Sequence, residues 1–323
     1  MKYDLVTLGE TMLRLTPPGQ QLIEQATELA LYVGGSESNV AVGLARLGWR
    51  VAWLSRLTDN ALGRRIATAI RAHGVDTTYV TWTDADRVGV YYVEEGPPPR
   101  GSSVIYDRAG SAMSRMQPTD LPIDLFTPDG ARVLHLSGIT LAIGEAAAQT
   151  AQAAAQRARS AGWLVSFDVN HRAMLWSAAA AAAGCDPLLA LADVVFVAQR
   201  DAVTLYGAPD APGDAIRHIQ ARCPGAVIVM TLGAEGALAL TPDGAIWRQA
   251  AFSAQGSGRV GGGDAFAAGF LCGYLETQAV EQALTWGAAA AAYKYTLPGD
   301  MPLLDRARVR AIIDHGHNTG IQR

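Results

Sequence analysis

The chain has 323 residues, half of them hydrophobic, with 26 basic and 30 acidic residues and a formal net charge of −4. This balance gives no electrostatic case for binding nucleic acid or an anionic membrane, and no apolar run is long enough to cross a bilayer. The three cysteines, Cys185, Cys223 and Cys272, lack C-x-x-C spacing and so indicate neither a disulfide framework nor a zinc site. We expect a cytoplasmic protein that acts on a small molecule, since the first residues resemble a strand rather than a signal peptide.

Six short apolar runs alternate with eight helical patterns along the chain. Continuous rather than alternating hydrophobicity indicates strands that are buried on both faces. The alternation predicts an α/β fold with a doubly wound, mostly parallel sheet flanked by helices. The expected strands lie at residues 5–8, 51–54, 133–136, 164–167, 194–197 and 226–230, and the expected helices at 36–47, 60–73, 145–161, 177–191, 213–222, 264–276, 279–293 and 305–313.

Two segments break this alternation, at about residues 10–33 and 87–108. Both contain short strand-like runs beside Pro-Pro-Gly or Gly-Pro-Pro-Pro turns. We expect them to form a small antiparallel β lid on a single domain that spans residues 1–323. Because the edges of such a sheet are unpaired, its apolar face is also the expected surface of a homo-oligomer.

Polar residues follow several of the expected strands, where ligands bind in open parallel sheets. Asn170 and Arg172 could contact an anion, although Arg172 could equally be a surface arginine paired with a carboxylate. Thr231, Gly233 and Gly236 form a compact turn that a nucleotide could approach.

An early glycine pair, Gly34-Gly35, precedes the helix expected at 36–47. Ser36 and Asn39 have the spacing of a helix cap with its capping-box partner, which is the structural interpretation. The functional alternative is that Asn39 hydrogen-bonds a polyol.

A late glycine turn, Gly261-Gly262-Gly263, leads directly into Asp264 and an Ala-rich helix. Glycine amides and a helix start suit an anion, and a carboxylate beside them suits removal of a proton from an attacking hydroxyl. Asp264 could instead only cap the helix. The sequence has neither a Walker loop nor the protein-kinase motifs, so phosphoryl transfer here would use backbone amides, arginines and a metal ion.

Taken together, the two glycine motifs make the chain resemble the ribokinase-like (PfkB) sugar kinases over nearly its whole length. Gly34-Gly35 with Asn39-Val40-Ala41 is similar to the first signature of that family, and Gly261-Gly262-Gly263-Asp264 resembles the second. Within the family the likeness is greatest to 2-keto-3-deoxygluconate kinases. It is carried by residues 33–37, 106–112, 134–140 and 168–172.

The resemblance implies an ATP-dependent kinase that phosphorylates a terminal hydroxyl of a sugar acid, with Mg²⁺ and with Asp264 as the base. Guanidinium groups of Arg108 and Arg172 suit the carboxylate of such an acceptor. The implied acceptor site comprises Gly34, Gly35, Ser36, Glu37, Ser38, Asn39, Tyr91, Tyr106, Arg108, Arg172 and Asp300. The implied ATP site comprises Asn170, Thr231, Gly233, Glu235, Gly236 and the Gly261, Gly262 and Gly263 loop.

Two positions depart from the family pattern. Where the family has Asn-x-x-Glu, this chain has Ala198-Gln-Arg-Asp201, so Asp201 is the expected indirect support for Mg²⁺. Where many members have an aspartate that helps to hold a monovalent cation, this chain has Gly258-Arg259-Val260, so potassium activation is not expected. Two alternatives remain open. One is a kinase for a neutral sugar or nucleoside; the other, motivated by these departures, is a non-catalytic sugar or nucleotide sensor on the same fold. A nicotinamide dehydrogenase is disfavoured, because no G-x-G-x-x-G follows the first strand.

Overall fold

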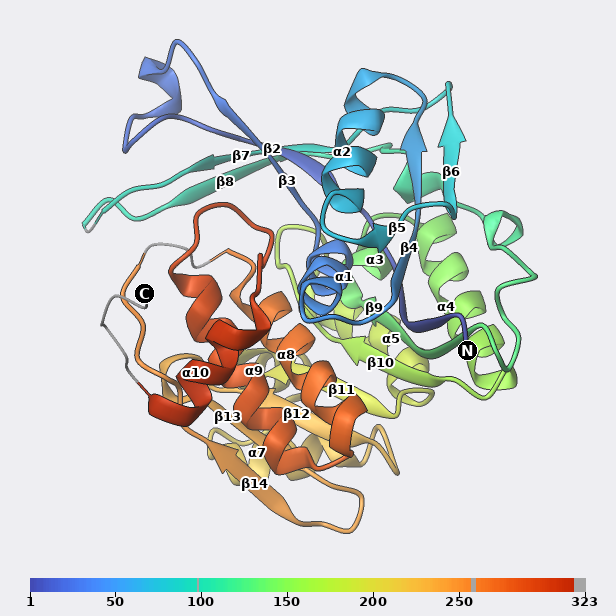
Figure 1. Ribbon diagram of the computed structural model, residues 1–323, viewed down its shortest axis with the longest axis vertical. Helices are drawn as coiled ribbons and strands as arrows, with labels where there is room; N and C mark the ends of the chain where they lie inside the picture. Colours follow the sequence, from blue (N-terminus) through green and yellow to red (C-terminus); the bar gives the residue numbers. More distant parts are fainter. Residues whose placement is uncertain (98, 257–259, 317–323) are drawn as a thin grey trace.

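The computed structural model describes residues 1–97, 99–256 and 260–316. Its main feature is a ten-stranded sheet in the order β14-β13-β12-β11-β10-β9-β1-β4-β5, with β6 paired to β4 (Figure 1). The strands of this sheet are β1 (Tyr3–Leu8), β4 (Val51–Thr58), β5 (Val75–Asp76), β6 (Val80–Thr83), β9 (Ala131–Ser137), β10 (Leu164–Asp168), β11 (Val194–Ala198), β12 (Val227–Thr231), β13 (Ala237–Leu240) and β14 (Ile246–Gln249).

Parallel pairing dominates the large sheet. β1 pairs in parallel with β4 on one side and β9 on the other, and the parallel register continues to β12. Only β13 and β14, at one edge, pair antiparallel. The mostly parallel sheet expected from the sequence is therefore confirmed.

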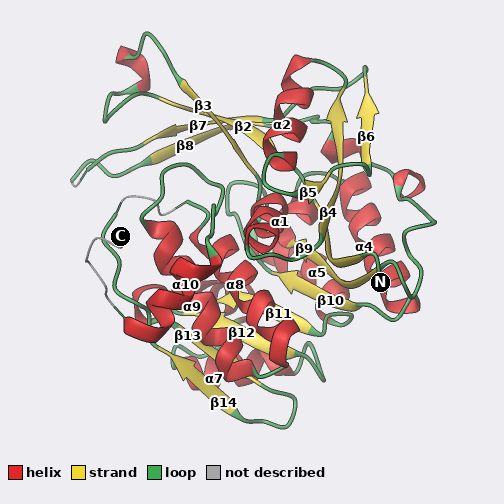
Figure 2. Cartoon of the chain, viewed as in Figure 1, coloured by secondary structure: helices red, strands yellow, loops and turns green. Residues whose placement is uncertain are grey.

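Helices cover both faces of this sheet (Figure 2). Alternate residues of one strand point to opposite sides, so that Leu5 belongs to one hydrophobic cluster and Val6 to the other. The first cluster contains residues of α1 (Ser36–Arg46), α2 (Ala61–Arg71), α8 (Gly262–Thr277), α9 (Val280–Tyr295) and α10 (Arg306–His315). The second contains residues of α3 (Gly138–Ala142), α4 (Glu145–Ser160), α5 (Ala178–Leu189), α6 (Gln199–Tyr206) and α7 (Pro212–Gln220).

A separate sheet of four strands, here called the small sheet, has the order β3-β2-β7-β8. Its strands are β2 (Met12–Thr16), β3 (Ala30–Gly34), β7 (Val90–Glu94) and β8 (Ser103–Asp107). The two outer pairings are antiparallel, as expected, but β2 and β7 pair in parallel. The reason is topological: the large-sheet strands β4 to β6 intervene in the chain, and β7 returns to the small sheet running in the direction of β2.

All six expected strands and all eight expected helices are present, with ends that differ by a few residues. The short strands β5, β6, β13 and β14 and the helices α3 and α6 were not expected. Helix α6 begins with Gln199, Arg200 and Asp201, which carry no apolar periodicity of their own, and its inner face is set by packing of Ala202 and Tyr206.

Candidate active site

Asp264 lies in the first turn of α8, where its buried carboxylate accepts two hydrogen bonds. Ser36 Oγ donates to Oδ1 at 2.8 Å, and Asn39 Nδ2 donates to Oδ2 at 2.7 Å. The N-cap of α8 is Gly261, and no side chain caps this helix start. The interpretation of Asp264 as only a helix cap is therefore wrong. Burial raises the pKa of Asp264, and the bonds from Asn39 and Ser36 oppose that effect.

Helix α1 supplies both donors from a single turn. Its N-cap is Gly35 without a side-chain bond, so Ser36 and Asn39 do not form the capping box that their spacing suggests. Their polar groups turn to Asp264 instead. Asn39 Oδ1 is buried and has no partner among the described residues, which leaves it able to accept a hydrogen bond from a ligand hydroxyl.

Asn170 extends this chain of hydrogen bonds from the end of β10. Its Nδ2 donates to Ser36 Oγ at 2.8 Å, so Ser36 accepts from one residue and donates to Asp264. Asn170 has a φ of 40°, a left-handed conformation that aspartate and asparagine tolerate better than most residues. Three distant segments, α1, α8 and the β10 end, thus meet at one carboxylate.

The glycine turn before Asp264 needs glycine at one position and is open at the next two. Gly261 has a φ of 79°, and a Cβ there would overlap the carbonyl oxygen of Asp300. A Cβ at Gly262 or Gly263 would meet nothing within 4 Å. Described atoms therefore do not crowd the side-chain positions of Gly262 and Gly263, and the first amides of a helix have no partner within the helix, which makes this helix start a candidate anion site.

Asp300 is the second buried carboxylate of the site. Its Oδ1 accepts from Tyr91 Oη at 2.8 Å, and its Oδ2 accepts from Arg14 Nη1 at 3.1 Å. Gly34 packs directly against this group, because a Cβ at Gly34 would lie 2.6 Å from Tyr91 Oη and 2.7 Å from Asp300 Cβ. The early glycine pair thus allows the end of β3 to approach Asp300.

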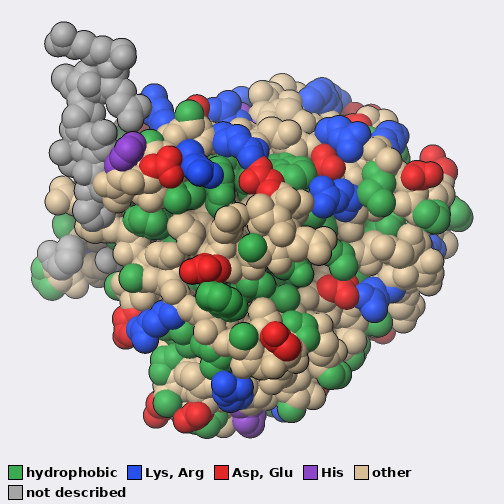
Figure 3. Space-filling view, turned by 60° about the horizontal axis from the view of Figure 1, so that its bottom comes forward, with side chains coloured by type: hydrophobic (Ala, Val, Ile, Leu, Met, Phe, Trp, Pro, Cys, Tyr) green, Lys and Arg blue, Asp and Glu red, His purple; other side chains and the backbone are tan. Residues whose placement is uncertain are grey.

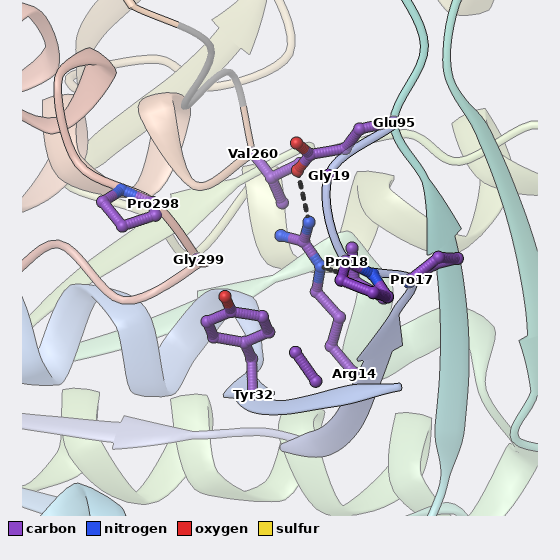
Figure 4. Close-up of a pocket in the computed structure, with 11 residues that line it drawn as sticks. Arg14, Pro17, Pro18, Gly19, Tyr32, Glu95, Val260, Pro298 and Gly299 are labelled. Atoms are coloured by element: carbon purple, nitrogen blue, oxygen red, sulfur yellow. Dashed lines mark hydrogen bonds and ion pairs between the residues drawn. The ribbon is translucent and has the colours of Figure 1, made fainter. Parts of the chain in front are cut away.

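Arg14, on β2, was not predicted from the sequence as a site residue. Its side chain is 2% exposed and also bonds to Glu95 at 2.6 Å, while its guanidinium lies over the ring of Tyr32 (Figure 4). A cavity of about 150 Å³ adjoins it, lined in part by Tyr32, Glu95, Pro298 and Gly299. A cation on the inward face of an otherwise apolar strand is the signal that could have identified Arg14.

Arg108, at the end of β8, is buried and held by Glu10. Arg108 Nε donates to Glu10 Oε2 at 2.8 Å, and Nη2 bonds to the same oxygen. The guanidinium lies 5.7 Å from the centre of the Tyr106 ring, which stacks on Tyr91. Tyr91, Tyr106 and Arg108 therefore lie together on one side of the small sheet, and Glu10 is a partner that sequence reasoning missed.

Arg172 is half-buried and forms no ion pair within the described part of the chain. It donates to the carbonyl of His171 at 3.3 Å. Its charge lowers the pKa of both Asp264 and Asp168, although burial, the larger effect, raises the pKa of Asp168 to about 8. Within the described residues, the structure therefore gives no support to the interpretation of Arg172 as a surface arginine in an ion pair.

Glu37 and Ser38 have their side chains engaged by the protein. Glu37 Oε1 accepts from Ser137 Oγ at 2.7 Å and Thr140 Oγ1 at 2.6 Å, and burial raises its pKa to about 7. Ser38 Oγ accepts from Thr11 Oγ1 at 2.7 Å. These contacts join the start of α1 to the end of β9, to α3 and to Thr11, the residue before β2.

Four of the residues expected at the nucleotide, Thr231, Gly233, Glu235 and Gly236, lie at the end of β12 and in the turn that follows it. Thr231 ends the strand, Gly233 and Glu235 lie in a 3₁₀ turn, and Gly236 has a φ of 100°. Glu235 is exposed and pairs with Arg248 at 3.4 Å.

Asp201 is buried near the start of α6, 3.4 Å from Arg200 Nε, and burial raises its pKa. No group of three or more His, Cys, Asp or Glu residues that could hold a metal lies within the described ranges. Gly258 and Arg259, on which the expectation about potassium rests, lie outside the described residues.

The chain is similar to known proteins over nearly its whole length. The sequence pattern of the pfkB family of carbohydrate kinases matches residues 2–306. The chain belongs to this family. It is 40% identical to a 2-dehydro-3-deoxygalactonokinase of Haloferax volcanii over all of both chains. It is 31% identical to a 2-dehydro-3-deoxygluconokinase of Bacillus subtilis, with 93% of this chain and 92% of the relative covered.

Among solved structures, the 2-dehydro-3-deoxygluconokinase of Thermotoga maritima superposes with a TM-score of 0.87 at 29% identity, and 97% of this chain and 99% of that chain are covered. The family and the ribokinase-like fold expected from the two glycine motifs are therefore confirmed for this pfkB kinase.

On the face shown in Figure 3, the basic side chains of the described residues are interspersed with acidic ones. None of the described helices has both the length and the apolar character that a membrane span needs.

Proposed function

We propose that this pfkB kinase transfers the γ-phosphate of ATP to a terminal hydroxyl of a sugar acid, 2-keto-3-deoxygluconate. The observation that carries the proposal is the buried carboxylate of Asp264 in the first turn of α8, directly after Gly262 and Gly263, whose side-chain positions meet no described atom within 4 Å. A hydroxyl acceptor needs a base to take its proton, and the negative charge of the transferred phosphoryl group needs fixed hydrogen-bond donors, which backbone N–H groups supply.

In the proposed step, the acceptor oxygen attacks the γ-phosphorus and forms the new O–P bond. The bond between the γ-phosphorus and the β–γ bridging oxygen breaks, and ADP leaves. Asp264 takes the hydroxyl proton, while the amides of Gly261, Gly262 and Gly263 bind the transferred group. Ser36 and Asn39 hold the carboxylate in place, and the Oδ1 atom of Asn39 is available to a second acceptor hydroxyl.

The acid group of the acceptor has two candidate cations. Arg108 is held in a fixed orientation by Glu10, and Arg172 has no ion-pair partner within the described residues. A guanidinium forms paired hydrogen bonds with a carboxylate, whereas a neutral sugar offers no such charge. Gly34, Gly35, Tyr91, Tyr106 and Asp300 would complete the acceptor site, with Glu37 and Ser38 behind it.

For the nucleotide, we assign Asn170 and the turn that contains Thr231, Gly233, Glu235 and Gly236. Mg²⁺ usually keeps several waters and binds through substrate phosphates and one or two carboxylates, so a dedicated cluster is not required. Asp201 would act on the ion indirectly. When bound, Mg²⁺ would neutralise phosphate charge.

The galactose-derived epimer of the acceptor is a second candidate. The relative that is 40% identical over its full length is named a 2-dehydro-3-deoxygalactonokinase, whereas the relative at 31% identity is named for the gluconate epimer. Both epimers carry the carboxylate and the terminal hydroxyl that the site requires.

We assign two roles to the small sheet, a lid over the acceptor and a surface for a second copy. Tyr91 donates to Asp300 and Tyr106 stacks on Tyr91, so this side of the small sheet adjoins the candidate acceptor site. On the other side, Leu31, Leu15, Tyr92 and Ile105 are register neighbours in a row across all four strands, and Leu31 and Ile105 are exposed. An apolar row of this kind suits burial against another subunit.

The deciding experiment measures ATP-dependent phosphorylation of 2-keto-3-deoxygluconate, its galactose-derived epimer, fructose, ribose and adenosine. We expect the wild type to phosphorylate one or both keto-deoxy acids. In Arg108→Ala and Arg172→Ala, the KM for these acids should increase, and the KM for neutral acceptors should change little. Preference for a neutral acceptor would refute the sugar-acid assignment. Nucleotide binding without turnover of any acceptor would favour the sensor.

A further inference from the structure

Lys294 is one of two lysines in the chain and lies in the last turn of α9 with none of its side chain exposed. Its ammonium donates to the carbonyl of Leu297 at 3.2 Å and to that of Gly299 at 2.9 Å. Both carbonyls belong to residues 296–300, the segment that follows α9 and carries Asp300. Lys294 thus holds this segment from inside the protein.

The same side chain passes directly beneath the anion-binding turn. A Cβ at Gly261 would lie 3.4 Å from Lys294 Cε and would overlap the carbonyl of Asp300. Lys294, Asp300 and Gly261 are therefore packed in consecutive contact. The turn that is to hold the transferred phosphoryl group rests on a buried cation and on the segment that this cation organises.

The charges around Lys294 connect it to both carboxylates of the site. Burial lowers its pKa, whereas the charges of Asp300 and Asp264 raise it. Arg14, on strand β2 of the small sheet, pairs with Asp300, so the charges of Arg14 and of Lys294 on helix α9 both act on this carboxylate. Burial of an ammonium is costly unless carbonyls and opposite charges surround it, and both are present here.

An ammonium among backbone carbonyls is chemically similar to a bound small monovalent cation, because NH₄⁺ and K⁺ favour the same oxygen ligands. We infer that Lys294 is a permanent internal cation of the anion-binding turn. It positions the segment 296–300 against Gly261 and adds positive charge beneath the turn, so phosphoryl transfer needs no added monovalent cation. Lys294 is a positioning residue, and this role rests on the proposed phosphate-binding function of the turn.

The test is chemical rescue of Lys294→Met, which keeps a similar length without the charge. Phosphorylation is measured with tetramethylammonium as the only monovalent cation, and again with NH₄⁺ or K⁺ at the same ionic strength. We expect the wild-type kcat to change less than about twofold. The variant should lose about 10²-fold, the scale for loss of one electrostatic donor, and should regain about tenfold or more with NH₄⁺. Lys2→Met serves as the matched control.

Two results would overturn the inference. One is a wild-type rate that rises about tenfold or more when K⁺ replaces tetramethylammonium. The other is a folded Lys294→Met variant whose rate is normal, or is low and not restored by NH₄⁺. A purely structural lysine predicts loss without rescue.

Thermal unfolding provides a second measurement that does not depend on the acceptor. Lys294→Ala leaves a larger space beside the Leu297 and Gly299 carbonyls, so NH₄⁺ should raise its Tm relative to tetramethylammonium, with no such change in the wild type. An unchanged Tm would count against the inference even if the variants were inactive. If no acceptor in the panel is phosphorylated, the proposed function fails, while this Tm comparison still decides the role of Lys294.

Discussion

Asn39 Nδ2 lies 2.7 Å from Asp264 Oδ2, although 225 positions separate the two residues in the chain. Ser36 binds the other oxygen of the same carboxylate. The two glycine motifs of the sequence therefore meet at one carboxylate, which α8 carries and α1 orients. In the proposed reaction this carboxylate is the base.

Replacement of Asp264 by Asn should lower kcat by about 10²- to 10⁴-fold, because Asn cannot accept the hydroxyl proton. The amide keeps the size of the side chain, so the affinity for nucleotide should change little. Steady-state kinetics together with calorimetric titration of ATP measure both quantities. Normal turnover in this variant would refute the assignment of the base.

Removal of Asn39 should shift the acidic limb of the pH–rate profile. Burial raises the pKa of Asp264, and the Asn39 hydrogen bond lowers it. Without that bond the pKa rises further, so a higher pH is needed to ionise the base. We expect the kcat/KM profile of Asn39→Ala to lose activity at a higher pH than that of the wild type. A limb at the same or lower pH would contradict a role for Asp264 ionisation.

Gly261→Ala and Gly263→Ala form a matched pair within one turn. The first places a Cβ against the Asp300 carbonyl at a φ of 79°, so we expect a loss of about 1–3 kcal/mol in unfolding free energy and a lower kcat. The second meets no atom within 4 Å and should keep its stability. Urea unfolding and initial rates compare them, and equal stability of the two variants would show that the close approach to Asp300 is unimportant.

Arg14→Met should raise the acceptor KM about tenfold, because Asp300 loses a charged hydrogen bond of about 1.5–3 kcal/mol. Glu95→Gln is the control: its side chain is 41% exposed, so loss of its pair with Arg14 should have little effect. The KM for ATP should stay unchanged in both variants. A uniform fall in the amount of active enzyme, with KM values preserved, would instead indicate that Arg14 is only structural.

Glu37 should make the protein less stable as the pH rises. Its folded pKa of about 7 exceeds its ordinary value of 4.5, so between these values the unfolded state releases the proton first. The stabilisation is complete below about pH 4.5 and is lost as the pH rises to about 7, at a cost of up to about 3 kcal/mol. Glu37→Gln should gain that amount relative to the wild type between pH 4.5 and 8 in urea unfolding. A constant difference between the two proteins would mean that Glu37 titrates normally.

The order of strands and helices could be predicted because it depends on local pattern. The run at 194–197 is apolar throughout, the run at 133–136 is apolar except for His135, and each forms a buried parallel strand. Strand β6 and helix α6 could not be predicted, because their short segments carry mixed residues whose burial is decided by neighbours. The local interpretations of Asp264 and Ser36 as helix caps were wrong for the same reason: a capping pattern cannot reveal that a better partner comes from a distant helix.

By itself, the sequence determined the α/β class, the two glycine motifs and the carboxylate that follows the second, since hydrophobic period and backbone freedom are properties of adjacent residues. Only the tertiary structure decided which partner each buried charged side chain has. Glu10 pairs with Arg108, Arg14 pairs with Asp300, and Lys294 donates to backbone carbonyls close to Gly261. The local sequence around each of these residues does not identify its distant partner. They form because burial of a charge is tolerated only where folding brings an opposite charge or a polar group to it.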